Sequence, residues 1–197
     1  SMSLILASSS RYRRALLERL GLPFEVAVPG VDESRLPGEA PVALVGRLAE
    51  QKARAVASQF DDALIIGSDQ LAVLGDDVLG KPGNFDTNVA TLSRLSGRAV
   101  QFLIGLCLLN SGLGRCQCDV VEFNVVFREL STRQIEAYVQ REQPYECAGG
   151  FRSEGLGIAL FESMSGDPTA LIGLPLIRLV QMLRVEGIDV LDPSGVA

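Results

Sequence analysis

Apolar and polar residues alternate in blocks along the chain, and the first blocks predict strands and helices in turn. Residues 4–7 form a short apolar run, which is typical of a buried strand. Three serines follow, and they predict the capped start of a helix that ends at Gly21. Residues 24–28 predict a second strand, and the proline-rich residues 29–41 predict a loop.

The middle of the chain predicts a long helix followed by a central strand. Residues 41–60 repeat apolar side chains at helical spacing, with Lys52 in the middle of the apolar stripe. Residues 63–66 are an unbroken apolar run, typical of a strand buried on both faces. That run ends in the polar residues 67–70, after which residues 71–74 continue in extended form.

The second half predicts a helix, a long hairpin and two further helices. Asp86 is the expected cap of the first helix, and residues 100–109 and 116–127 predict the two strands of the hairpin. Residues 131–134 resemble a capping box, and Pro175 lies near the first turn of the last helix. We therefore predict the α/β class with a mixed sheet, as a single domain over residues 1–197 that folds as one or two lobes.

Composition favours a soluble protein with a sizeable core. The chain has 197 residues, of which 47% are hydrophobic, and this is enough for one domain. No apolar run approaches the roughly 20 residues that a membrane span needs, and no signal peptide is recognisable. We expect a cytoplasmic protein without membrane contact, and we interpret Ser1 and Met2 as the remnant of an expression tag.

Charge and residue usage exclude several classes of function. The chain contains no histidine, so Ser-His-Asp, Cys-His and H-E-x-x-H chemistry are all excluded. The remaining inventory favours a hard cation such as Mg²⁺ or Mn²⁺, held by carboxylates. The net charge of −6, without a long basic stripe, argues against nucleic acid as the main partner.

The four cysteines form no C-x-x-C pair and no dense disulfide pattern. They are Cys107, Cys116, Cys118 and Cys147. Cys116 and Cys118 lie on one face of a predicted strand, but a zinc site needs two more ligands, and we expect none nearby. We expect ordinary buried or surface thiols.

The first junction between strand and helix is a candidate anion site. Ser8 and the two serines after it stand at a predicted helix N-terminus, and Arg11, Arg13 and Arg14 follow within four residues. Free backbone N–H groups, hydroxyls and guanidinium groups together suit a phosphate. The alternative is an ordinary capped helix whose arginines are solvated.

Acidic and basic residues at three other places are candidates for chemistry. Asp69 follows the predicted central strand, where open α/β sheets place their ligands, although it can equally be a simple turn former. Asp32, Glu33 and Asp69 together can hold a divalent cation. Lys52 either points its ammonium into a cleft or extends to the helix edge. Glu154, in a glycine-rich segment, is a weak candidate alone.

Seven short motifs in order resemble the Maf family of nucleoside triphosphate pyrophosphatases. They are "LASSSRYRR", "VDE", "EQKA", "IIGSDQ", "GKP", "SEGLGI" and "IGLPL". Each is weak alone, but their order and spacing cover almost the whole chain. The resemblance implies an elongated α/β structure with two lobes around a central cleft. It also implies hydrolysis between the α and β phosphates with a divalent metal cation (Mg, Mn or Co). Homodimers are common in the family.

The resemblance also implies residue roles. Asp69 matches the proposed general base, and Glu33 matches the carboxylate beside the metal, which Asp69 also contacts. With the serine junction included, the predicted phosphate-binding residues are Ser8, Arg13, Arg14, Lys52 and Lys81. Cations spread along a triphosphate neutralise its charge, while a metal and a carboxylate position the attacking water.

Three positions separate the branches of the family by substrate. Members that act on dTTP and UTP tend to have Arg, Thr and Gln where this chain has Tyr12, Gln70 and Glu154. The chain instead resembles the branch acting on 7-methyl-GTP, although that branch often has tryptophan in place of Tyr12. An aromatic face attracts the cationic methylated guanine, and a glutamate accepts protons from its imino and amino groups. The alternatives are a dTTP/UTP pyrophosphatase and a nucleotide-binding regulator of cell division.

Overall fold

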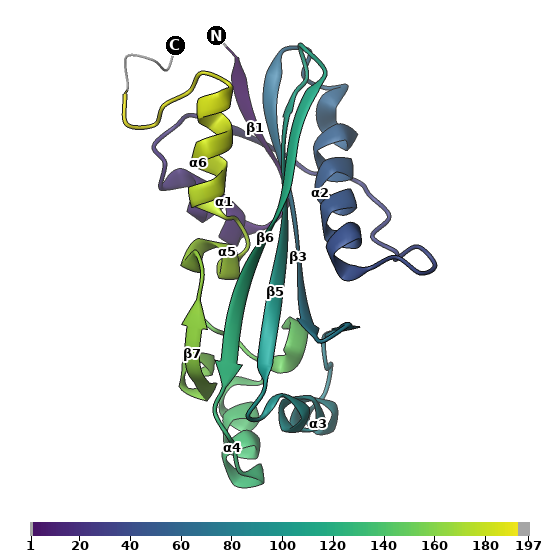
Figure 1. Ribbon diagram of the computed structural model, residues 1–197, viewed down its shortest axis with the longest axis vertical. Coiled ribbons are helices and arrows are strands. Elements are labelled where there is room, and N and C mark those ends of the chain that lie inside the picture. Colours follow the sequence, from purple (N-terminus) through teal and green to yellow (C-terminus); the bar gives the residue numbers. More distant parts are fainter. Residues whose placement is uncertain (1, 193–197) are drawn as a thin grey trace. The chain divides into compact units, whose positions relative to one another are not determined.

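The computed structural model describes residues 2–192 and confirms the α/β class (Figure 1). Its strands are β1 (Ser3–Ala7), β2 (Glu25–Ala27), β3 (Ala63–Leu74), β4 (Asp77–Val78), β5 (Ala99–Asn110), β6 (Arg115–Phe127) and β7 (Phe161–Ser165). Its α-helices are α1 (Arg11–Glu18), α2 (Pro41–Ala57), α3 (Phe85–Leu95), α4 (Thr132–Glu142), α5 (Pro168–Ile172) and α6 (Leu176–Val185), with short 3-10 turns η1 (Ala148–Gly150) and η2 (Leu156–Leu160). The sheet is mixed, as predicted, in the order β2-β1-β3-β5-β6-β7, with β4 beside β3. None of these helices is long and apolar enough to cross a membrane.

The described chain divides into two compact units. The first holds residues 2–70, 104–121 and 167–192, and the second holds Leu71–Leu103 and Glu122–Gly166. Strands β3, β5 and β6 contribute residues to both units because each is 12 or 13 residues long. The assignment of the chain as a single domain and the central cleft stay predictions. Ser1, half of the proposed tag remnant, lies outside the described residues.

The first unit is built on strands whose two faces are both apolar. β1 pairs in parallel with β2 and with β3. Leu4 and Leu6 pack in a core with leucines of α1 and α6, whereas Ile5 and Ala7 pack in a second core with alanines of α2. Side chains of a strand point alternately to its two faces, so an unbroken apolar run serves both cores. Figure 1 shows α1 and α6 on one side of these strands and α2 on the other.

Strand β3 is longer than the sequence pattern predicts. We expected the strand to end before residues 67–70, but it continues without a break to Leu74. Its last register pair with β1 joins Ile66 to Leu6, and farther along Val73 pairs with Val78 of β4. Asp69 therefore lies within an extended strand, beyond its parallel pairing with β1, and it is not a turn former.

The helix caps agree with the sequence except at α3. Ser10 caps α1 by accepting a hydrogen bond from the Arg13 backbone, and the predicted capping box of α4 is present. Helix α3 is capped by Asn84 and not by Asp86, because the Asn84 side chain accepts the Thr87 N–H. Asp86 lies in the first turn, where a negative charge interacts favourably with the helix dipole.

The second unit has an aromatic core. Four phenylalanine rings meet edge to face at centroid distances of 5.1 to 5.8 Å. They are Phe102, Phe127, Phe151 and Phe161. Such edge-to-face pairs each contribute roughly 0.5–1.5 kcal/mol beyond burial of their surface. The cluster joins β5, β6 and β7 to the glycine-rich segment that follows α4.

Candidate active site

Two glycines let helix α2 lie unusually close to the sheet. A Cβ atom on Gly67 of β3 would collide with the backbone of Ala49 and Ala53, and one on Gly105 of β5 would collide with the backbone of Val45. Only glycine allows this approach, since every other residue adds at least a Cβ atom. The close packing brings the side chains that follow Gly67 on the same face of β3 within reach of α2.

Lys52 of α2 and Asp69 of β3 meet at this contact. The Lys52 Nζ atom lies 2.8 Å from Oδ1 of Asp69 and 2.8 Å from Oε1 of Glu33. The side chains of Lys52 and Asp69 are only 13% and 10% exposed, whereas that of Glu33 is 60% exposed. Lys52 therefore does not extend to the solvent edge of its helix. Its buried charge is paired with two carboxylates, as a buried ammonium requires.

A small polar cavity adjoins these charges, with a volume of about 140 Å³. Its lining residues are Ser8, Ser9, Ser10, Arg13, Pro29, Val31, Glu33 and Lys52. The serine junction, Lys52 of α2 and Glu33 of the loop before α2 thus belong to one place in the first unit. Hydroxyls, an ammonium and a guanidinium around a small volume suit a phosphate group.

Arg13 is fixed to the chain beyond the hairpin. Its Nε donates a 2.8 Å hydrogen bond to the carbonyl oxygen of Gly173. Burial lowers the pKa of Arg13, and the negative charges of Asp69 and Glu33 oppose that shift. An arginine so placed still carries its charge at neutral pH, because its ordinary pKa is above about 12.

The opposite face of β3 anchors the "IGLPL" motif. The buried Ser68 hydroxyl lies within hydrogen-bond distance of the Gly105 and Gly173 carbonyl oxygens, at 2.9 and 3.1 Å. Gln70 donates through Nε2 to the Leu171 carbonyl oxygen at 2.8 Å. Sequence reasoning missed Ser68 and Gly173, although both stand in motifs quoted above, and a lone hydroxyl after an apolar run was the available signal.

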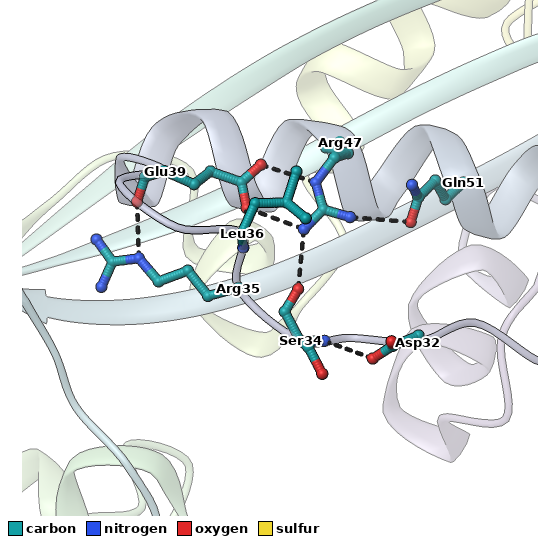
Figure 2. A network of polar contacts seen from close by, with 7 residues as sticks. All are labelled: Asp32, Ser34, Arg35, Leu36, Glu39, Arg47 and Gln51. Carbon is teal, nitrogen blue, oxygen red and sulfur yellow. Dashed lines mark hydrogen bonds and ion pairs between the residues drawn. The ribbon is translucent and has the colours of Figure 1, made fainter.

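The loop that carries Glu33 is held by an arginine (Figure 2). Arg47 of α2 binds both carboxylate oxygens of Glu39, at 2.7 and 2.9 Å, and also donates to the Ser34 carbonyl oxygen at 3.0 Å. The hydrogen bonds from Arg47 are the main reason why the pKa of Glu39 is lowered to about 2. These hydrogen bonds from Arg47 fix residues 34–39 against helix α2. Glu33 directly precedes this fixed segment.

Asp32 does not join the other two carboxylates in the structure. Its Oδ1 accepts the Ser34 backbone N–H at 2.9 Å, and hydrogen bonds from Ser34 lower the pKa of Asp32. The set of three acids expected from the sequence is therefore reduced to two, Glu33 and Asp69. Both offer an oxygen to the same cation, and carboxylate oxygens are the donors that Mg²⁺ and Mn²⁺ prefer. The residues present thus fit a hard divalent metal.

The remaining predicted residues are exposed and are not among the residues that line the cavity. Arg14 pairs with Glu18 at 3.6 Å along α1. The Tyr12 ring is covered by the Arg11 guanidinium at 5.1 Å from its centroid. Lys81 and Glu154 are exposed residues of the second unit, and the Ser153 hydroxyl donates to Glu154 at 3.0 Å. The functional roles of all these residues stay predictions.

The expectation that no metal ligand lies near Cys116 and Cys118 is wrong. Cys107 Sγ of the neighbouring strand lies 2.7 Å from Cys116 Sγ, and Cys118 Sγ lies 3.4 Å from Oε1 of Glu50. Sequence distance hid both neighbours, because strand β5 and helix α2 bring them in from other parts of the chain.

Comparison with known proteins gives a consistent result. The family model described as Maf-like protein matches residues 3–186. A Pseudomonas putida protein named 7-methyl-GTP pyrophosphatase is 59% identical, over 96% of this chain and 99% of its own. A Nitrosococcus oceani protein of the same name is 55% identical over 96% of each chain, and one from Methylobacillus flagellatus is 56% identical over 95% and 98%.

A solved structure also shares the fold. The Staphylococcus aureus Ham1 protein superposes with a TM-score of 0.52 over 93% of this chain and 99% of its own. Its sequence identity is 13%, so this likeness concerns the fold alone.

Proposed function

This chain belongs to the Maf-like protein family, and from that membership we propose that it hydrolyses 7-methyl-GTP to 7-methyl-GMP and pyrophosphate. Nearly full-length similarity to relatives named for this activity supports the assignment. The structural observation that carries it is the meeting of Glu33 and Asp69 at the Lys52 ammonium, beside the serine-lined cavity. A carboxylate for water activation then stands next to donors for phosphate oxygens.

Asp69 acts as the general base. Its carboxylate accepts a proton from the attacking water, and the anhydride bond between the α and β phosphates breaks to release pyrophosphate. Lys52 fixes the Asp69 carboxylate through a 2.8 Å hydrogen bond, which holds Oδ1 in place on the strand. General bases typically contribute a factor of about 10²–10⁴ to the rate.

The cavity residues bind the triphosphate. An ammonium has three N–H donors, and Glu33 and Asp69 take two of those of Lys52, so one remains for a phosphate oxygen. Ser8 and its neighbours add hydroxyl donors at the N-terminus of α1, and Arg13 adds a guanidinium whose Nε is already fixed by Gly173. We assign Lys81 and Arg14 to further contacts with the same triphosphate.

Glu33 and Asp69 are the residues that would hold a divalent cation, with Mg²⁺, Mn²⁺ and Co²⁺ as candidates. Such a cation, when bound, neutralises phosphate charge and lowers the pKa of water. Glu33 is exposed, and its loop is fixed by Arg47. Its carboxylate can therefore leave the Lys52 ammonium and bind a metal cation instead, with little movement of the backbone.

Tyr12, Gln70 and Glu154 read the base. One face of the Tyr12 ring is covered by Arg11, so the other face is the one for stacking on the cationic methylated guanine. Glu154 accepts hydrogen bonds from the guanine edge, and uracil or thymine would leave that carboxylate poorly paired. Gln70 is held by Leu171, which fixes the orientation of its amide.

The test is release of pyrophosphate from 7-methyl-GTP, GTP, dTTP and UTP, each with Mg²⁺, Mn²⁺ or Co²⁺, with Asp69→Asn as the blank. We expect the highest kcat/KM for 7-methyl-GTP. Preference for dTTP or UTP would keep the chemistry and overturn the base-reading residues. Nucleotide binding without turnover would instead favour the regulator of cell division. The homodimer and the cytoplasmic location stay predictions, and light scattering of the purified chain tests the first.

A further inference from the structure

Three of the four cysteines form a cluster that the proposed reaction does not use. Cys107 lies on β5, and Cys116 and Cys118 lie on β6, all within the first unit. Cys116 Sγ is 2.7 Å from Cys107 Sγ and 3.2 Å from Cys118 Sγ, and the three sulfur atoms all lie within 4.8 Å of one another. Cys107 is fully buried, Cys116 is half-buried and Cys118 is exposed, so the cluster opens to solvent at one end.

A carboxylate beside Cys118, outside the group of three sulfur atoms, can supply a fourth donor when its side chain turns toward them. Oε1 of Glu50, on helix α2, lies 3.4 Å from Cys118 Sγ. The other oxygen, Oε2, accepts a 2.9 Å hydrogen bond from Arg54 one turn along the helix. Metal-binding carboxylates are generally oriented by such outer hydrogen bonds. Arg54 thus leaves one Glu50 oxygen free to face Cys118 and supplies a positive charge near Cys107 and Cys116.

We propose that Cys107, Cys116, Cys118 and Glu50 form a binding site for a thiophilic divalent cation, Zn²⁺, separate from the carboxylate pair Glu33 and Asp69. Sulfur-rich sets with one oxygen donor suit tetrahedral Zn²⁺, whereas the all-oxygen pair suits Mg²⁺ or Mn²⁺. The chain would then bind two kinds of metal, each at the site whose donor atoms suit it. The zinc would tie helix α2, which carries Lys52, to the β5–β6 strands.

The set of donors, rather than the spacing of the sulfur atoms, favours a metal over a disulfide. A disulfide would draw two sulfur atoms to about 2.05 Å and use only Cys107 and Cys116. It would leave Cys118 and Glu50 without a role. Zinc bonds of about 2.3 Å to sulfur separate two tetrahedral ligands by roughly 3.8 Å. The separations of 2.7 and 3.2 Å are shorter than that spacing, so zinc binding requires the sulfur atoms to move apart toward the ~3.5–4.0 Å of unbonded neighbours.

The experiment uses the full chain, reduced, stripped of metal with a chelator and titrated with Co²⁺ and Zn²⁺. We expect a near-ultraviolet sulfur-to-cobalt charge-transfer band that saturates at one Co²⁺ per chain and disappears when Zn²⁺ displaces it. Cys116→Ser and Cys118→Ser should each lose the band, and the exposed position of Cys118 makes its variant the safer fold. Glu50→Gln should weaken Zn²⁺ binding by at least about 10-fold, since even an outer-shell change costs roughly 10–100-fold.

Two variants are matched controls. Cys147→Ser removes the cysteine of the second unit and should leave the band and the zinc stoichiometry unchanged. Asp69→Asn should lower kcat by about 10²–10⁴-fold yet keep the band, which separates this site from the proposed reaction. A band that is absent, or that survives in both Cys116→Ser and Cys118→Ser, overturns the proposal. So does loss of two free thiols to a Cys107–Cys116 disulfide without metal uptake.

Discussion

The ammonium nitrogen of Lys52 lies 2.8 Å from Oδ1 of Asp69, on a strand 17 residues farther along the chain. Glu33 binds the same nitrogen at the same distance, so a cation already stands where the two carboxylates converge. Two positive charges at one point repel each other strongly in a partly buried site. A divalent metal held by Glu33 and Asp69, as we propose, would therefore compete with Lys52 for these oxygens until a triphosphate supplies negative charge to both.

The variant Lys52→Met should bind Mn²⁺ more tightly than the native chain in the absence of nucleotide, because the competing ammonium is gone. It should also lose about 10²–10³-fold in kcat, the usual cost of removing one donor to a developing charge. Calorimetric titration with Mn²⁺ and steady-state kinetics measure the two effects. Lys52→Arg keeps the charge and is the control. Unchanged or weaker Mn²⁺ affinity in Lys52→Met would refute the competition.

The variant Asp69→Asn should lose about 10²–10⁴-fold in kcat, because an amide cannot accept the water proton. The side chain keeps its shape, and Lys52 retains Glu33 as a partner, so the fold should persist. Circular dichroism and thermal unfolding check the fold beside the kinetics. Near-native turnover in a folded Asp69→Asn variant would remove this residue from the mechanism.

The sequence predicted local structure better than contacts between distant segments. The apolar run before Ser8 predicts a buried strand, which the structure confirms, and its residues pack alternately into two cores. Capping at Ser10 and Ser131 also follows from local chemistry. The continuation of β3 was missed because Ser68, Asp69 and Gln70 are poor strand formers, and their neighbours in space hold them extended.

The candidate site was predicted in its residues but not in its geometry. Motif resemblance identified Lys52 and Asp69 separately, whereas their ion pair depends on the close approach that Gly67 allows. A glycine followed by three polar residues is typical of a turn, so nothing in the local sequence indicates that Gly67 has a packing role. The cysteine cluster was missed for the same reason, since Cys107 and Glu50 reach Cys116 and Cys118 only through the fold.

The variant Gly67→Ala tests that packing directly. Its methyl group would collide with the backbone of Ala49, so helix α2 must shift, at a cost of roughly 1–3 kcal/mol in the free energy of unfolding. The shift should also weaken the Lys52–Asp69 pair and lower kcat. Urea unfolding measures the loss. Gly30→Ala is the matched control, because nothing lies within 4 Å of its added Cβ. Equal stability of the two variants would contradict the argument.

The Arg47–Glu39 pair should give the Glu33 loop an acid-dependent stability. The pKa of Glu39 falls from an ordinary 4.5 to about 2. A lowered folded-state pKa means that this contribution is fully present above pH 4.5 and is lost as the pH falls toward 2. The difference in unfolding free energy between the native chain and Glu39→Gln should therefore shrink from pH 6 to pH 3. Glu25→Gln, at an exposed strand position, is the control, and a difference that does not change with pH would refute the linkage.

The variant Glu154→Gln tests how the base is read. A carboxylate that accepts two hydrogen bonds from guanine and faces its added positive charge is worth roughly 1–3 kcal/mol, as for bidentate base contacts elsewhere. Glu154→Gln should therefore lower kcat/KM for 7-methyl-GTP by about 10–100-fold, chiefly through KM, since the phosphate chemistry at Asp69 is untouched. The same variant should gain relative activity on UTP, because glutamine both donates and accepts hydrogen bonds. Glu146→Gln, another exposed acid of the second unit, should behave as the native chain. If Glu154→Gln loses kcat equally on every nucleotide, Glu154 serves the chemistry or the fold and does not select the base.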